Sequence, residues 1–337
     1  AAQAIALGAG PVIAGLILDT LGWHWTFWIN VPLGIAGVVL GWLILPQTGH
    51  LPAGQRFDWR GAILIAPTLT AFVAVLNEAH AWGPTSPVLI GCLVVGIACA
   101  LLFWRAERRA AMPLLDLELL GKPAFLLGNA ANFLSYAALF GVFFLVPFAL
   151  VRLYDETALT AGLRLSILPV MLGLLAPLGG MLSDRLGTRI PTCCGMLACI
   201  AGLAMLYVFL DGSAANLPFV TLSLGLIGAG QGLFVSPNVS AIMATAPPDK
   251  TGQAGSVLNV VRLLGISAGI AGASTLFVVA LGRSSGSTLG LPAAELVAAS
   301  RDVVLLLICL AALAAAISLV RPGAAAAAKS SEEPAAP

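Results

Sequence analysis

Charged residues are scarce in this sequence. Only 9% of its 337 residues are Asp, Glu, Lys or Arg, whereas 59% are hydrophobic, and the mean hydropathy is +1.01. A water-soluble globule needs more polar surface than this to cover its core. The lack of charge therefore excludes an ordinary soluble domain and indicates that lipid surrounds most of the chain.

The patterns of several other protein classes are also missing. The net charge is +1 and no basic block is longer than the segment 105–109, so the chain offers no basic face to a nucleic acid. The three histidines, His24, His50 and His80, lack the close spacing of a metal site. No glycine-rich phosphate loop ending in Lys-Ser or Lys-Thr is present, which argues against an ATP-driven pump. We expect no enzyme, no cofactor, no metal and no nucleic-acid partner.

The cysteines do not form a disulfide framework. All six lie inside apolar runs, where a thiol behaves as a small hydrophobic group. We therefore predict a packing role for Cys92, Cys99, Cys193, Cys194, Cys199 and Cys309.

Long apolar runs separated by short polar breaks fill most of the sequence. A helix needs about 20 apolar residues to cross about 30 Å of hydrocarbon. The alternation with a period of two that marks a membrane β-barrel is absent. The sequence therefore predicts an all-α, polytopic transmembrane helix bundle with ten spans at 1–21, 27–45, 61–76, 87–104, 123–151, 161–182, 190–210, 217–245, 255–281 and 302–320.

The distribution of Lys and Arg predicts the orientation of these spans. If the first residues are cytoplasmic, the inner connections hold 12 of the 16 basic residues and the outer ones hold 4, namely Arg152, Arg164, Arg283 and Arg301. The positive-inside rule then places both chain ends in the cytoplasm. Trp23, Trp25 and Trp28 fall at the first outer connection, either at the headgroup level or in buried packing. We expect a multi-pass protein of the cell membrane.

The first span carries small residues at a regular spacing. Ala2, Ala6, Gly10 and Ala14 recur every four residues and predict a groove for a neighbouring helix. Pro11 predicts a kink beside that groove. The spacing alone is compatible with ordinary helix packing or with a dedicated gating role.

The segment from Gly10-Pro11 to Gly15, followed by 22–34, resembles the fifth helix and the fifth-to-sixth junction of the major facilitator superfamily. More narrowly, it is similar to the fourteen-helix drug:proton antiporters. Their fifth-helix motif reads Gly-x-x-x-Gly-Pro-x-x-Gly-Gly, and here Ala6 and Ala14 stand in place of two of its glycines. The motif residues are Ala6, Gly10, Pro11, Ala14 and Gly15.

A second resemblance lies at 180–189. Gly180, Asp184, Arg185, Gly187 and Arg189 are similar to the Gly-x-Leu-x-Asp-Arg-x-Gly-Arg-Lys loop of the superfamily. The resemblance implies a latch that closes the cytoplasmic side. On physical grounds Asp184 would cap the following helix or pair with a cation, and a positively flanked tight turn is the alternative.

A third resemblance covers 228–265. Gly228, Gly232, Ser236, Ser240 and Ala244 form a second four-residue ladder, and Gly265 and Gly269 begin another, so these helices should pack tightly. The stretch is similar to the twelfth and thirteenth helices of the fourteen-helix branch.

The resemblances divide the chain into four parts. Residues 1–46 correspond to helices five and six, 47–106 to a cytoplasmic loop and a linking transmembrane pair, 107–321 to a C-terminal six-helix bundle, and 322–337 to a disordered cytoplasmic tail. Because the chain begins inside a helix-like run, we expect an N-terminal truncation that removes helices one to four. In the family those helices carry the first latch and charges tied to proton coupling.

Polar residues deep in lipid are costly, so they tend to face a cavity or a partner helix. The candidates for a substrate cavity are Asn129, Asn132, Tyr136, Gln231, Asn238 and Asn259. Hydrogen bonding between helices without ligand contact is the alternative. The acids Asp19, Glu78, Asp155 and Glu156 lie near outer ends rather than at mid-span, so proton coupling is implied by the resemblance alone.

Together these observations predict a secondary transporter, driven by an ion gradient, that exports small amphipathic or cationic organic compounds with protons by alternating access. The alternatives are an exporter of one specific metabolite or lipid, and a membrane scaffold or sensor without turnover. The expected partners are the bilayer, a small organic substrate, protons and the missing N-terminal helices. Without those helices we expect the chain not to transport.

Overall fold

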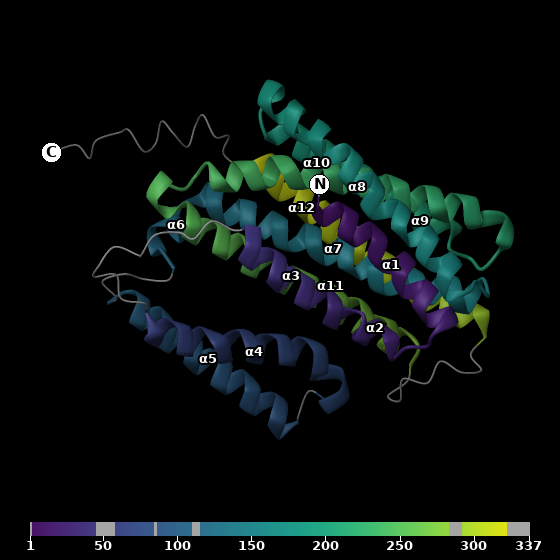
Figure 1. Ribbon diagram of the computed structural model, residues 1–337, viewed down its shortest axis with the longest axis horizontal. Coiled ribbons are helices and arrows are strands. Elements are labelled where there is room, and N and C mark those ends of the chain that lie inside the picture. Colours follow the sequence, from purple (N-terminus) through teal and green to yellow (C-terminus); the bar gives the residue numbers. More distant parts are fainter. Residues whose placement is uncertain (1, 45–57, 84–85, 110–114, 283–291, 322–337) are drawn as a thin grey trace.

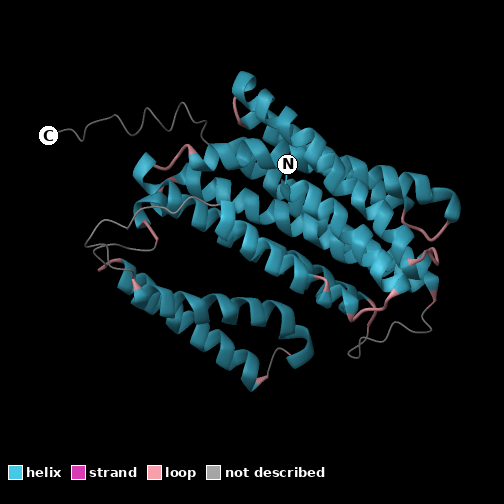
Figure 2. Cartoon of the chain, viewed as in Figure 1, coloured by secondary structure: helices cyan, strands magenta, loops and turns pink. Residues whose placement is uncertain are grey.

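The computed structural model describes residues 2–44, 58–83, 86–109, 115–282 and 292–321. Within these residues the chain is helical with short turns and contains no strand (Figure 2). The long helices are α1 (Ala2–Thr20), α3 (Asn30–Ile44), α4 (Trp59–Trp82), α5 (Pro87–Glu107), α7 (Pro123–Leu153), α8 (Ala158–Leu186), α9 (Arg189–Phe209), α10 (Leu217–Met243), α11 (Thr251–Ala280) and α12 (Ala293–Val320). The short ones are α2 (Trp25–Trp28), α6 (Leu117–Gly121), η1 (Ala214–Asn216) and η2 (Pro248–Lys250).

The predicted all-α transmembrane fold is confirmed. In the described residues 9 segments are long and apolar enough to cross a membrane, with α2 and α3 counted as one segment from Trp25 to Ile44. The remaining predicted span, the first one at 1–21, corresponds to α1, whose stretch from Leu7 to Thr20 is apolar but shorter than the other nine segments. The predicted tail at 322–337 lies outside the described residues, and so does most of the predicted connection at 46–60.

Helices α7 to α12 form a bundle with its own apolar core (Figure 1). The largest cluster of buried side chains draws on all six helices and includes Val142 of α7, Leu168 of α8, Leu206 of α9, Leu224 of α10 and Val304 of α12. These side chains are fully buried. The six-helix bundle is therefore the most extensively packed part of the described chain.

Glycine lets α10 lie against two neighbours at once. A Cβ on Gly232 would come within 2.6 Å of the Leu172 carbonyl oxygen of α8, and one on Gly195 of α9 would come within 2.6 Å of the Gly230 carbonyl oxygen. A Cβ on Gly265 of α11 would likewise meet the Phe133 carbonyl oxygen of α7 at 2.6 Å. Only a residue without a side chain permits such backbone approaches. The close packing predicted from the glycine ladders of α10 and α11 is thus observed.

The remaining helices are arranged around this bundle. Helix α1 lies along α8, and the α4–α5 pair forms a separate layer that contacts the bundle through α4 and α11 (Figure 1). Asn77 Nδ2 of α4 donates to Ser267 Oγ of α11 at 3.2 Å. Helix α3 has no buried residue, so its apolar surface lies open to lipid or to another chain segment.

The observed helices extend beyond several predicted spans. Helix α12 begins at Ala293 instead of 302, and α8 continues to Leu186 instead of 182. Charged residues lie within these added turns, among them Arg301, Asp184 and Arg185. A span inferred from apolar runs ends where charge begins, whereas backbone hydrogen bonding continues the helix into the headgroup region.

Candidate functional site

The proline-containing first helix is seated directly on α8. A Cβ on Gly15 would come within 2.6 Å of the Ala158 carbonyl oxygen, and one on Gly162 would collide with the Pro11 carbonyl oxygen. Next to this contact, Asp19 Oδ2 accepts a hydrogen bond from the Leu159 N–H at 3.0 Å. A carboxylate is well placed at the first turn of a helix, where backbone N–H groups lack partners. Two glycines and one acid thus fix α1 against the start of α8.

Helix α1 contacts α8 with a face other than that of the four-residue ladder, whose groove stays a prediction. Gly10 is exposed, and a Cβ on it would meet no atom within 4 Å, while Ala14 is half-buried. The face toward α8 runs instead through Gly8, Pro11 and Gly15. Small residues occur on both faces of this helix, so their spacing alone could not select the one that packs. Ala6 lies in α1.

A reciprocal pair of hydrogen bonds joins α7 to α10 in the bundle interior. Ser135 Oγ donates to Gln231 Oε1 at 2.7 Å, and Gln231 Nε2 donates to the Ser135 carbonyl oxygen at 3.1 Å. Both side chains are buried, at 0% and 1% exposure. The amide of Gln231 is therefore already used between helices.

A second polar contact joins three helix segments at the end of the bundle where α7 begins. Asn238 Nδ2 of α10 donates to the Gly128 carbonyl oxygen of α7 at 3.2 Å. Arg321, which directly follows α12, donates from Nη1 to Asn238 Oδ1 at 2.8 Å. Burial lowers the pKa of Arg321 to about 10, so the guanidinium stays charged at neutral pH.

Asn129 and Asn132 lie in α7 between these two contacts. Asn129 Nδ2 donates to the Phe125 carbonyl oxygen at 3.0 Å. Within the described part of the chain, its Oδ1 and both polar atoms of the fully buried Asn132 have no hydrogen-bond partner. A buried amide without partners costs about 1–3 kcal/mol. Asn132 is therefore the candidate whose amide is most available to another polar group.

Tyr136 and Asn259 belong to a separate cluster with Arg262. The Arg262 guanidinium carbon lies 5.9 Å from the centre of the Tyr136 ring, and Arg262 Nη2 donates to Asn259 Oδ1. Tyr136 also stacks on Phe140 with 6.4 Å between ring centres. Asn259 is exposed, unlike the other five cavity candidates. The structure thus separates the six candidates into two groups. Four lie in the buried α7–α10 seam, and two lie beside Arg262, namely the buried Tyr136 of α7 and the exposed Asn259 of α11.

The residues of the second motif occupy the turn between α8 and α9. Asp184 and Arg185 lie in the last turn of α8, Gly187 has a positive φ of 77°, and Arg189 begins α9. The prediction that Asp184 caps the following helix is wrong, because the residue at that position is Thr188 and no side chain caps α9. Asp184 is exposed and forms no ion pair with a described residue. Gly180 instead approaches Ser236 Oγ, which a Cβ would meet at 3.3 Å.

Sequence reasoning missed an ion-pair cluster at the end of the bundle where α7 begins. Lys250 of η2 pairs with Asp116 and, at 2.9 Å, with Glu118 Oε2. Asp116 also accepts a hydrogen bond from the Glu118 N–H at 2.8 Å and so caps α6. Lys122 adds a bond of 2.9 Å to the Thr245 carbonyl oxygen. The cluster joins the entry of α7 to the connection between α10 and α11.

A second missed cluster lies at the opposite end of the bundle. Arg164 Nε of α8 bonds to Glu156 Oε1 at 2.6 Å, and its Nη1 donates to Thr221 Oγ1 of α10 at 2.9 Å. Close by in the sequence, Tyr154 donates its hydroxyl to the Phe209 carbonyl oxygen at 3.1 Å. Glu156 lies in the turn before α8, eight positions from Arg164, whereas the bonds to Thr221 and Phe209 join segments 57 and 55 positions apart in the sequence. In the described residues no group of three or more His, Cys, Asp or Glu could hold a metal ion.

Residues 1–270 match the family model of the Major Facilitator Superfamily. The chain is similar to the protein named uncharacterized transporter YebQ of Escherichia coli, with 34% identity over 80% of this chain and 58% of the relative. It is also 33% identical to the riboflavin transporter RibZ of Clostridioides difficile, over 81% of this chain and 58% of the relative. The multidrug resistance protein Stp of Mycobacterium tuberculosis is 29% identical over 80% of this chain and half of its own length.

Among solved structures, a bacterial homologue of the iron transporter ferroportin in an inward-facing state aligns with 93% of this chain and 81% of its own. The TM-score is 0.43 and the identity 16%, which is too distant to support an inference. The chain thus spans a little over half the length of the curated relatives it matches.

Proposed function

The chain belongs to the major facilitator superfamily, and from this premise we propose that its protein is a proton-coupled exporter of small amphipathic or cationic organic compounds. The proposed mechanism is alternating access, in which helix bundles rock against one another around a central site. Energy comes from the proton gradient. The activity belongs to the whole protein that contains this chain.

The contact between α1 and α8 is the observation that carries this proposal. It joins the proline-containing motif to the six-helix bundle through backbone contacts at Gly15 and Gly162. Close backbone contacts at glycines support rocking of one helix on the other, because few large side chains have to repack there. Asp19 at the α8 N-terminus adds one polar bond that can open and close with such a movement.

The relatives support drug export in part and also favour a second candidate. Stp carries the name of a multidrug resistance protein, whereas RibZ, with the higher identity of 33%, is named a riboflavin transporter. The second candidate is therefore a transporter of one specific metabolite with a conjugated, partly polar ring system.

Within the six-helix bundle we propose Asn132 as the residue of the α7–α10 seam most suited to contact substrate. Its amide has no partner in the described part of the chain, whereas the amides of Gln231 and Asn238 are used between helices. Because Asn132 is fully buried, contact requires a conformation in which the seam opens. Next to Arg262 of α11, we propose the exposed Asn259 and the buried Tyr136 of α7 as further contacts.

The four-part division at 46, 106 and 321 and the cytoplasmic placement of both chain ends remain part of the proposal. The positive-inside distribution of Lys and Arg supports the orientation. In that orientation the turn at 180–189 lies on the cytoplasmic side and acts as the latch. The protein is placed in the cell membrane.

Efflux from cells that express the complete gene tests the proposal. Cells loaded with a panel of fluorescent cationic and neutral dyes, and separately with riboflavin, are followed with and without a protonophore. We expect protonophore-sensitive efflux of several cationic dyes, and reduced efflux or a changed dye preference for Asn132→Ala. Transport of riboflavin alone supports the second candidate, and absence of any gradient-dependent transport contradicts both.

A further inference from the structure

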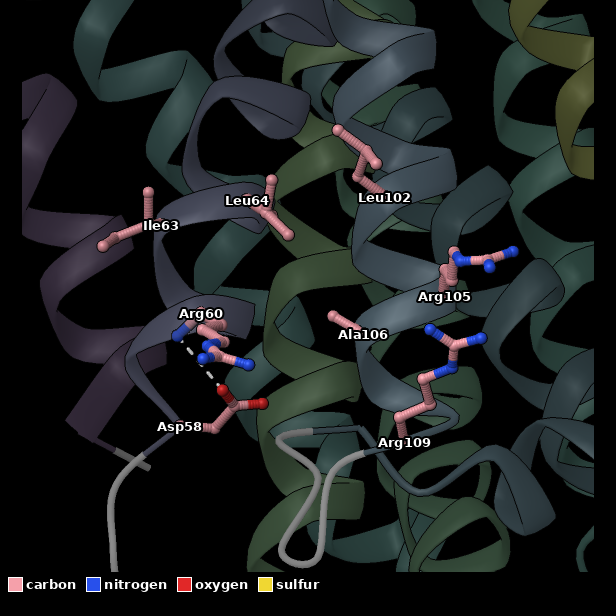
Figure 3. Close-up of a pocket in the computed structure, with 8 residues that line it drawn as sticks. All are labelled: Asp58, Arg60, Ile63, Leu64, Leu102, Arg105, Ala106 and Arg109. Atoms are coloured by element: carbon pink, nitrogen blue, oxygen red, sulfur yellow. Dashed lines mark hydrogen bonds between the residues drawn. The ribbon is translucent and has the colours of Figure 1, made fainter.

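A pocket of about 530 Å³ lies between one end of α4 and the adjoining end of α5. Its lining contains three arginines together with Asp58: Arg60 of α4, Arg105 of α5, and Arg109 in the turn after α5 (Figure 3). The apolar wall consists of Ile63, Leu64, Leu102 and Ala106. This volume is in the range of small-molecule sites, about 300–1,000 Å³. None of these residues takes part in the proposed transport function.

The pocket has a polar end and an apolar end. Arg105 lies in the last turn of α5 and Arg109 in the turn that directly follows this helix, and Arg60 lies across from them on α4 (Figure 3). Ile63 and Leu102 extend the pocket along the two helices, and both are exposed, at 67% and 53%. In a membrane-spanning pair such exposed apolar side chains face lipid tails. A ligand at this site therefore meets cations at the headgroup level and hydrocarbon beneath them.

The arginines are electrostatically available. Within the described part of the chain none of the three forms an ion pair with an acid. The nearby acid Glu107 is buried, at 3% exposure, and accepts a hydrogen bond from the Leu115 N–H at 3.3 Å. Counting Asp58 against the three arginines leaves a net charge of +2 in the lining. Charge complementarity therefore favours an anion.

Asp58 restricts which anion fits. Its Oδ1 accepts hydrogen bonds from the N–H groups of Arg60 at 3.1 Å and Gly61 at 3.0 Å, which caps the start of α4. Its Oδ2 is buried and has no hydrogen-bond partner in the described residues. A carboxylate oxygen can only accept hydrogen bonds, so the group next to it must be a donor such as a hydroxyl. The pocket thus combines cations for a phosphate with an acceptor for a hydroxyl.

We propose that this α4–α5 pocket binds an anionic phospholipid whose headgroup carries free hydroxyls, such as phosphatidylglycerol. The phosphodiester lies among Arg60, Arg105 and Arg109, a glycerol hydroxyl donates to Asp58 Oδ2, and an acyl chain follows Ile63 and Leu102. Arginine binds phosphate oxygens with paired N–H donors, and basic pockets between transmembrane helices recognise anionic headgroups. Beyond the pocket the two helices pack closely on each other, because a Cβ on Gly96 of α5 would come within 2.8 Å of the Ala71 Cβ of α4.

Lipid binding to the purified 337-residue chain in detergent tests the proposal by native mass spectrometry. The probes are phosphatidylglycerol, phosphatidic acid and phosphatidylcholine with identical acyl chains. We expect phosphatidylglycerol to bind best, since phosphatidic acid lacks the hydroxyls and phosphatidylcholine carries no net charge. Glycerol 3-phosphate and inorganic phosphate serve as competitors without acyl chains. Full displacement of phosphatidylglycerol by either competitor would indicate a soluble-anion site and overturn the lipid assignment.

Two variant pairs separate this pocket from general surface charge. Arg105→Gln/Arg109→Gln should weaken phosphatidylglycerol binding about 30-fold. This is the loss of affinity expected for one basic residue near an anionic membrane surface, multiplied over the two arginines. Arg185→Gln/Arg189→Gln is the matched control, because it removes two exposed arginines with the same spacing elsewhere. We expect binding to the control to be unchanged. Equal losses in the two pairs would overturn the proposal.

Asp58→Asn tests the hydroxyl contact without removing the helix cap, because Asn caps helices as well as Asp does. The change removes the negative charge that faces the phosphate, so binding of phosphatidic acid should rise toward that of phosphatidylglycerol. An unchanged preference between the two lipids would contradict the role assigned to Asp58. If the double variant does not fold, Arg60→Gln alone supplies the same comparison from α4.

Discussion

Ser135 and Gln231 exchange two hydrogen bonds across the α7–α10 contact, one from side chain to side chain at 2.7 Å and one from the amide to the backbone carbonyl at 3.1 Å. The two residues are 96 positions apart in the chain. Because both are buried among apolar side chains, each polar atom that loses its partner has no water to replace it. The pair therefore sets the register of α7 against α10.

This relationship predicts a measurable coupling energy. Ser135→Ala and Gln231→Leu should each lower the free energy of unfolding in detergent by about 1–2 kcal/mol. The double variant should lose less than the sum of the two, with a coupling of about 0.6–1.7 kcal/mol. Denaturation followed by helical circular dichroism measures all four corners of the cycle. Strict additivity would show that the two side chains do not depend on each other.

The sequence predicts the helices well because apolar length and glycine spacing are local properties. The ladder of Gly228 and Gly232 identified the face of α10 that meets α8, since four-residue spacing places side chains on one face. In α1 the four-residue ladder places Gly10 on a face where an added Cβ would meet no described residue within 4 Å, whereas Gly15, on another face, makes the contact with α8. Where small residues cover two faces of a helix, only the partner helix decides which face is used.

The polar contacts could not be predicted in the same way. Lys250 pairs with acids more than 130 positions earlier in the chain, and Arg321 meets Asn238 from a different helix. Such pairs depend on which helix ends meet in three dimensions. The sequence nevertheless marked Gln231 and Asn238 as costly in lipid, and the interhelical hydrogen bonds left open as an alternative are the contacts these two residues make.

The α1–α8 contact predicts a sharp difference between two glycines of the same helix. Gly15→Ala should lower the unfolding midpoint, because the new Cβ would lie 2.6 Å from the Ala158 carbonyl oxygen and forced overpacking costs about 1–3 kcal/mol. Gly10→Ala is the matched control, since no atom lies within 4 Å of the Cβ it adds, and alanine favours a helix. Thermal unfolding of the three proteins in the same detergent gives the comparison. Equal midpoints for both variants would contradict the observed α1–α8 contact.

The carboxyl group of Asp116 should make the ion-pair cluster around Lys250 depend on pH. Burial alone would raise the pKa of its carboxyl, but the hydrogen bonds from Lys250 and the Glu118 N–H, with the nearby charge of Lys122, outweigh burial and lower the pKa below its ordinary value. A carboxyl with a lowered pKa stabilises the folded state above its unfolded pKa of about 3.9 and loses that contribution as the pH falls through the folded value. The cluster should therefore be intact at neutral pH and should open below about pH 4.

Hydrogen exchange of the amides in 115–121 measures this opening. Protection should fall in acid for the unchanged protein, and Lys250→Met should already show the lower protection at neutral pH, with little further change in acid. Asp116→Asn keeps a capping side chain for α6 but removes the titrating group, so its protection should not vary with pH in this range. A full pH response in Asp116→Asn would assign the effect to another residue.

Replacing Asp184 should reduce transport without reducing the stability of the protein. Its carboxylate is exposed, caps no helix and forms no ion pair with a described residue, so Asp184→Asn should leave the unfolding midpoint unchanged. If the turn at 180–189 acts as a latch, the carboxylate must find its partner in another conformation of the complete transporter. Removing its charge should then slow gradient-driven efflux about tenfold, which corresponds to the loss of one charge-assisted hydrogen bond. The matched control is Asp249→Asn, because Asp249 is an exposed aspartate of η2 at the same end of the bundle. This variant should transport normally.

Normal efflux by Asp184→Asn would leave the turn with a purely structural role, in which Gly187 with its positive φ of 77° connects α8 to α9.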